Sequence, residues 1–145
     1  MNDKEIWEFI ESQKTIQVCS LDQHGNPHLV PMWFFTTDKK IILISYSKSQ
    51  KIVNLKRNPA IAVLLEDGSE YHELRGVSIN CMAELVSEPT QVQAMEKKLI
   101  ARNHPGLTEA AAEEMTSKMS HKKTAIIVTP GKVKSWDHRK LDSDY

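Results

Sequence analysis

A short run of hydroxyl, amide and ammonium groups lies near the middle of the chain. The segment from Ser45 to Lys51, SYSKSQK, follows an apolar run and precedes apolar residues at helical spacing, so we expect it to join a strand to a helix. The N–H groups in the first turn of a helix, with their partial positive charge, favour an anion. Ser49 can donate a hydrogen bond and Lys51 adds a full positive charge, which together suit a phosphate monoester. The same residues also fit a plain helix cap with solvated lysines.

The first half of the chain predicts a short helix followed by strands. Ile6, Phe9 and Ile10 fall on one helical face after a cap at Asn2 or Asp3. Apolar runs with turn residues between them then predict a three-stranded meander, with strands at 15–21, 28–35 and 41–47. Pro31 cannot donate to a strand ladder, so the second strand must lie at an edge or contain a bulge or a break.

The second half predicts further strands on both sides of a helical pair. The helix after the polar segment is expected to start at Ser47 or Ser49 and to end at Pro59. Ser87 is expected to cap a helix that runs to about Asn103, and Thr108 a second one that runs to about Met119. The remaining strands are expected at 60–67, 72–86 with a bend or bulge at Gly76, 123–130 and 132–138.

Strands that cluster, rather than alternate with helices, indicate antiparallel pairing. A closed or nearly closed barrel would remove most exposed sheet edges. We therefore predict a mainly β protein with a few helices, an antiparallel split barrel that forms one domain over residues 1–145.

Composition excludes several classes of protein. The 19 basic and 19 acidic residues balance, which argues against a nucleic-acid-coating protein. No apolar run approaches the roughly 20 residues that span a bilayer, and the polar, acidic start does not fit a signal peptide. Cys19 and Cys81 are interpreted as buried free thiols, with a disulfide or a metal pair as the alternative. We expect a cytoplasmic protein without a membrane or nucleic-acid partner.

The order and spacing of several motifs resemble the pyridoxamine 5'-phosphate oxidase-like superfamily of split-barrel, FMN-binding proteins, especially its small general-stress and nitroimidazole-resistance members. The likeness covers roughly residues 5–90 and 122–141. The residues that carry it are Val30, Pro31, Trp33, Phe34, Ser49, Lys51, Asn54, Leu55, Pro59, Trp136 and Asp137.

This resemblance implies a homodimer with two FMN sites at the subunit interface. Ser49 and Lys51 would hold the FMN phosphate, and Ser45 and Tyr46 would contact its ribityl or phosphate atoms. Backbone from Val30 to Trp33 would line the isoalloxazine ring, and Trp136 would come from the partner chain. The implied cofactor-binding residues are Val30, Pro31, Met32, Trp33, Ser45, Tyr46, Ser49, Gln50, Lys51 and Trp136.

Two departures from the family pattern shape the functional prediction. Gln50 stands where members with the strongest phosphate clamp carry arginine. The chain also ends soon after Trp136, without the longer segment that supplies substrate-binding arginine and histidine in true pyridoxamine-phosphate oxidases. We therefore do not expect it to oxidise pyridoxamine phosphate.

The resulting prediction is an FMN-dependent oxidoreductase that acts on a small organic substrate. The alternatives are a reductase that uses an 8-hydroxy-5-deazaflavin coenzyme, a non-catalytic flavin-binding or haem-binding stress protein, and a split barrel whose site has been lost. Trp33 and Trp136 would stack on a flavin or fill the barrel. No residue is identified as catalytic, and His24 and His28, which flank a turn, do not make a recognisable metal motif.

Overall fold

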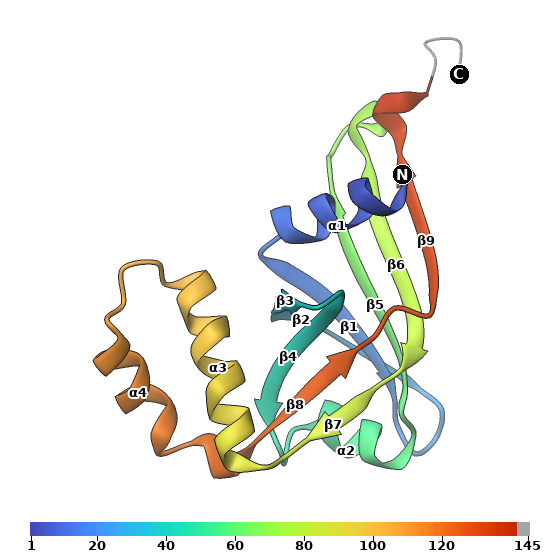
Figure 1. Cartoon of the computed structure of the whole chain (residues 1–145). Helices are drawn as coiled ribbons and strands as arrows, with labels where there is room; N and C mark the ends of the chain where they lie inside the picture. Colours follow the sequence, from blue (N-terminus) through green and yellow to red (C-terminus); the bar gives the residue numbers. More distant parts are fainter. Residues whose placement is uncertain (142–145) are drawn as a thin grey trace.

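Two antiparallel sheets form the body of the protein in a computed structural model, which describes residues 1–141 (Figure 1). The large sheet has the strand order β2-β1-β5-β6-β9, and the small sheet has the order β3-β4-β8-β7. The strands are β1 (Thr15–Leu21), β2 (Pro27–Trp33), β3 (Phe35–Thr37), β4 (Lys40–Tyr46), β5 (Ala60–Asp67), β6 (Arg75–Met82), β7 (Glu84–Val86), β8 (Lys123–Val128) and β9 (Lys132–Asp137). The arrangement confirms the predicted mainly antiparallel split barrel within one domain.

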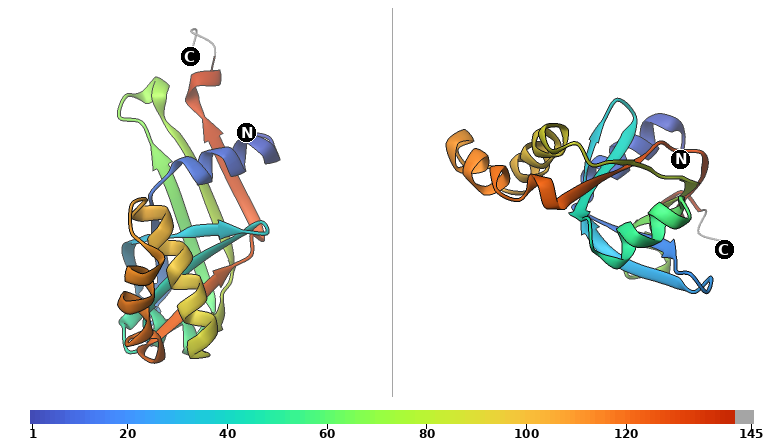
Figure 2. Two further views of the ribbon diagram at one scale, coloured as in Figure 1. Left: turned by 60° about the vertical axis from the view of Figure 1, so that its left-hand side comes forward. Right: turned by 90° about the horizontal axis from the view of Figure 1, so that it is seen from below.

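Within residues 1–141, four α-helices surround the sheets, and short 3₁₀ turns occur at Tyr71–Glu73, Ser120–Lys122 and His138–Lys140. The helices are α1 (Asp3–Ser12), α2 (Gln50–Arg57), α3 (Pro89–Asn103) and α4 (Glu109–Ser117). Figure 2 shows α3 and α4 side by side, projecting from one side of the barrel. None of the helices within residues 1–141 combines the length and the apolar character that crossing a bilayer requires.

The main core lies between the sheets, where β1 alternates buried residues such as Ile16 and Val18 with partly exposed ones. α1 contributes Phe9 to this core and α2 contributes Leu55, so each helix closes the barrel at a different end (Figure 1). A second apolar cluster, built on Leu99, joins α3 to the outer side of the small sheet. Burial of these side chains supplies most of the driving force for folding.

The predicted three-stranded meander is wrong, because β1 and β2 pair in the large sheet while β3 and β4 pair in the small one. The chain changes sheets at Phe34, whose side chain is completely buried. Its burial in the core breaks the expected strand 28–35 in two. Among the described residues β2 pairs with β1 alone, so Pro31 lies on an edge strand, as its missing N–H requires.

The predicted long strand 72–86 is also wrong. It begins as a 3₁₀ turn, continues as β6, and changes sheets at Ala83 to become β7. The N–H of Ala83 donates to the carbonyl of Pro59 at 2.7 Å, which fixes the break there rather than at Gly76.

Helix caps and cysteines depart from expectation in smaller ways. Glu88, not Ser87, is the N-cap of α3, because its carboxylate accepts bonds from the first-turn N–H groups. Thr108 caps α4 as predicted. Cys19 and Cys81 are free thiols as predicted, but each is partly exposed rather than buried.

Gly76 has a packing role in place of the predicted bend. A Cβ atom added there would lie 2.1 Å from the Trp136 ring, so only glycine lets this ring lie against β6. We expect Gly76→Ala to destabilise the fold by about 1–3 kcal/mol, the usual cost of overpacking. Urea unfolding measures the change, and the cost should shrink in a Trp136→Leu background. An equal cost in both backgrounds would contradict a clash with the ring.

Candidate cofactor site

The loop between β4 and α2 is held by serine hydroxyl groups. Ser49 is the N-cap residue of α2, but its Oγ lies 3.0 Å from the Oγ of Ser45 and does not cap the helix. The N–H of Ser49 donates to the carbonyl of Tyr46 at 2.9 Å, which closes a tight turn. No side chain within residues 1–141 caps α2, and its first turn carries no acidic residue. The N–H groups of that turn are therefore left to an external acceptor.

Asn54 fixes α2 to the barrel. Its side chain is completely buried, donates to the Oγ of Ser20 at 3.1 Å, and accepts from Gln50 at 2.7 Å and from Arg57 at 3.3 Å. This network holds the helix and turns the Gln50 side chain toward Asn54.

Loss of this network should weaken the fold. We expect Asn54→Ala to lower the free energy of unfolding by about 2–3 kcal/mol, because buried polar partners lose their bonds. Urea unfolding of the apoprotein measures this change. The matched variant Asn58→Ala removes an amide that follows α2 and accepts one hydrogen bond within the described part of the chain, from the N–H of Ala60, so it should cost less. Equal costs would contradict the central role of Asn54.

A pocket of about 320 Å³ opens beside the loop, where the end of β2, the end of β4 and the start of α2 meet α3 and β8. We call it the cradle pocket. Its lining residues are Met32, Trp33, Ile44, Ser45, Tyr46, Lys51, Leu99 and Lys123. It thus combines ammonium and hydroxyl groups with an apolar wall, as a phosphate-bearing aromatic ligand requires.

Lys51 is the group in this pocket that most clearly needs a ligand. Burial lowers the pKa of its ammonium group. No carboxylate within residues 1–141 forms an ion pair with it. A partly buried cation without a counterion favours an anion, and the uncapped α2 favours the same charge at the same place. The residues present therefore fit a phosphate group.

The cradle pocket brings together only part of the predicted cofactor set. Met32, Trp33 and Tyr46 line it with Ser45 and Lys51, and Ser49 reaches it through its contact with Ser45. Their contact with a cofactor stays a prediction.

The other predicted residues lie outside this lining. The side chains of Val30 and Pro31 do not line the pocket, although the prediction concerned their backbone. Gln50 lines a neighbouring pocket beside His28 and Arg57. Trp136 lies on β9, at the opposite edge of the large sheet from β2, which carries Trp33 (Figure 1 labels both strands).

Sequence reasoning missed Lys123 and Glu96. Only the long-range pairing of Tyr46 with Lys123 in the small sheet brings the lysine to the pocket, and no local motif predicts that pairing. Glu96 lies on the same face of α3 as the buried residues Val92 and Leu99. An acid on the apolar face of a helix is a signal that the sequence does carry.

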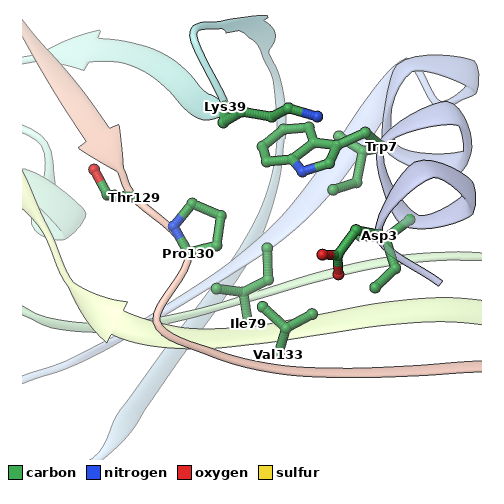
Figure 3. Close-up of a pocket in the computed structure, with 9 residues that line it drawn as sticks. Asp3, Trp7, Lys39, Ile79, Thr129, Pro130 and Val133 are labelled. Atoms are coloured by element: carbon green, nitrogen blue, oxygen red, sulfur yellow. The ribbon is translucent and has the colours of Figure 1, made fainter. Parts of the chain in front are cut away.

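A second pocket, of about 450 Å³, lies near α1 (Figure 3). Trp7 and Pro130 face each other across it, and the Lys39 ammonium lies 5.2 Å from the centre of the Trp7 ring. Of the predicted cofactor residues, none lines this pocket. The cradle pocket is therefore the better candidate for a phosphate-bearing ligand.

Comparison with known proteins defines the class. The family model described as pyridoxamine 5'-phosphate oxidase matches residues 3–137, and the chain belongs to this family. The conserved hypothetical protein Rv2991 from Mycobacterium tuberculosis is 37% identical, with a TM-score of 0.90 over 97% of this chain and 88% of that one. A comparison with curated proteins gave no match.

Two more distant structures share the fold. A putative 5-nitroimidazole antibiotic resistance protein from Bacteroides thetaiotaomicron is 15% identical, with a TM-score of 0.75 over 92% of this chain and 82% of that one. A structure described as F420 reductase is 24% identical, with a TM-score of 0.70 over 88% of this chain and 94% of that one. At these identities the likeness shows the fold.

Proposed function

We propose that the protein binds FMN in the cradle pocket and is an oxidoreductase that acts on a small organic substrate. One observation carries the proposal: Lys51, partly buried and without a carboxylate partner among residues 1–141, lies beside the uncapped start of α2 and an apolar wall. A phosphate monoester attached to an aromatic ring system meets each of these features.

Each group would have a separate task in the bound state. Lys51 would hold the phosphate with a charge-assisted hydrogen bond, and the hydroxyls of Ser45 and Ser49 would add neutral ones. The apolar side chains of Met32 and Trp33 would border the ring and limit the access of water. A bound flavin supplies the hydride or electron transfer, so the protein has to bind, orient and shield it.

We further propose that a second copy of the chain covers the outer face of the large sheet. Apart from Gly76, the residues on this face are at least partly exposed, including the apolar Leu29 at 65% and Met82 at 66%. Exposed apolar surface on a sheet favours association. The face also carries Trp33, by its register with Thr15, so a second copy docked there would lie next to the cradle pocket.

The position of Trp136 supports the same assembly. Its register with Gly76 puts it on this outer face, on the edge strand β9, across the sheet from the edge strand β2 that carries Trp33. A two-fold axis parallel to the strands, between two such faces, would place β9 of one copy against β2 of the other. Trp136 of the partner subunit would then complete the site, as the family resemblance implies.

A deazaflavin reductase is the competing proposal, motivated by the likeness to the structure described as F420 reductase. The anion site suits either cofactor, because Lys51 and the start of α2 would recognise the phosphate and would not discriminate between the two ring systems. We place the protein in the cytoplasm, where a reducing environment suits its two free thiols.

The test is direct. The purified protein is examined by visible spectroscopy and titrated with FMN and with riboflavin, which lacks the phosphate. We expect tight FMN binding, weaker riboflavin binding, and bleaching of the flavin bands by a reduced nicotinamide. A Soret band would point to haem, and binding of a deazaflavin in preference to FMN would support the competing reductase. A colourless protein that does not bind FMN would overturn the proposal.

A further inference from the structure

A buried ion pair adjoins the cradle pocket. The Nζ of Lys123 on β8 donates to the Oε1 of Glu96 on α3, with 2.5 Å between these atoms. The side chain of Glu96 is 8% exposed and that of Lys123 is 17% exposed. The pair therefore joins the helical layer to the small sheet at the point where the pocket opens.

Stability alone does not account for this pair. Taking two charges out of water is costly, and an apolar pair of similar size is often as stable or more so. The other carboxylate oxygen of Glu96, Oε2, is buried and has no hydrogen-bond partner within the described chain. Glu96 also interrupts an otherwise apolar helical face, where leucine would pack. These features indicate that the carboxylate serves to hold Lys123 in place.

Lys123 is held at the wall of the cradle pocket. It pairs with Tyr46 in the register of β4 and β8, and its Nζ lies 5.2 Å from the centre of the Tyr46 ring. One ammonium proton is taken by Glu96, which leaves two for a ligand. The pocket lining thus contains two ammonium groups, Lys51 and Lys123, that come from different elements.

Lys123 also compensates for the lack of a second cation on α2 beside Lys51. Gln50 occupies the position next to Lys51, but its amide donates to Asn54 and its side chain lines a different pocket. The α2 segment therefore brings one cation to the cradle pocket, and β8 brings the other.

We propose that Lys123 is the second cation that contacts the cofactor phosphate, and that Glu96 is the residue that positions it. This inference rests on the proposed FMN function. It assigns to β8 and α3 a part of the phosphate site that the β4–α2 loop does not supply.

The experiment compares FMN with riboflavin in variants of similar side-chain length. Lys123→Gln keeps a donor for Glu96 but removes the charge. We expect its FMN dissociation constant to rise about tenfold, as loss of a charged hydrogen bond implies, with riboflavin binding unchanged. Lys118→Gln makes the same change of charge at an exposed position after α4 and should alter neither affinity.

Glu96 is tested through the ratio of the two affinities, which a merely structural role would not move. Glu96→Ala should lower the preference for FMN over riboflavin, and Glu96→Gln should restore that preference. In a Lys123→Gln background, Glu96→Ala should not change the preference further. If wild-type protein prefers FMN and Lys123→Gln keeps the full preference, this inference is overturned while the proposed function stands. If wild-type protein does not bind FMN, both are overturned.

Discussion

Replacing Lys51 by methionine is expected to remove most of the phosphate-dependent affinity for FMN while leaving the apoprotein at least as stable. A charged hydrogen bond contributes about 1.5–3 kcal/mol, so the FMN dissociation constant should rise roughly 10-fold to 150-fold. Riboflavin, which has no phosphate, should bind both proteins alike. Fluorescence titration with the two ligands gives the comparison.

The stability half of this expectation follows from the pKa of Lys51. Burial lowers the folded-state pKa below the ordinary 10.5, so the charged form is disfavoured in the folded apoprotein. This penalty is complete below the lowered folded pKa and disappears as the pH rises above 10.5. Methionine carries no such penalty, so the urea midpoint of the variant at neutral pH should equal or exceed that of wild type.

A matched control lies in the same loop. Lys48 is exposed and carries the same charge, so Lys48→Met should change neither FMN affinity nor the urea midpoint appreciably. FMN binding by Lys51→Met with wild-type affinity would show that the phosphate lies elsewhere. A large loss of stability in that variant would show that Lys51 has a structural partner.

Local chemistry made part of the site predictable. Ser49 and Lys51 lie within one short segment, so a strand, a turn and a helix were enough to suggest an anion site. Pro31 was informative for the same reason, because a missing N–H restricts a strand whatever its partner. In each case the physical cause lies in the residue itself or in its immediate neighbours.

Long-range pairing made the rest unpredictable. A hairpin at β3–β4 has the same local pattern whether or not it joins β2, and the change of sheets at the buried Phe34 depends on where the core lies. Lys123 meets Tyr46 across a sheet, although 76 residues lie between them in the chain. Glu88 is the N-cap of α3 instead of Ser87, a difference of one residue in the helix boundary. Helix and capping propensities do not fix a boundary to one residue.

A charge on the outer face of the large sheet is expected to dissociate the proposed dimer. Leu29→Lys and Met82→Lys change side chains that are 65% and 66% exposed in one chain, so neither should weaken the isolated fold. In an apolar interface an unpaired ammonium group costs on the order of several kcal/mol, enough to shift the dissociation constant of the dimer by several powers of ten. Sedimentation equilibrium measures this shift.

The same variants test whether the cofactor site is shared. Met115→Lys places the same charge on α4, where the residue is 51% exposed, and should leave both assembly and FMN binding unchanged. If Leu29→Lys becomes monomeric and loses FMN affinity, although Leu29 does not line the cradle pocket, the partner must supply part of the site. Trp136→Leu should then weaken FMN binding without dissociating the dimer. A monomer with full FMN affinity would instead mean that one chain holds the cofactor alone, and a Leu29→Lys protein that remains dimeric would move the interface away from this face.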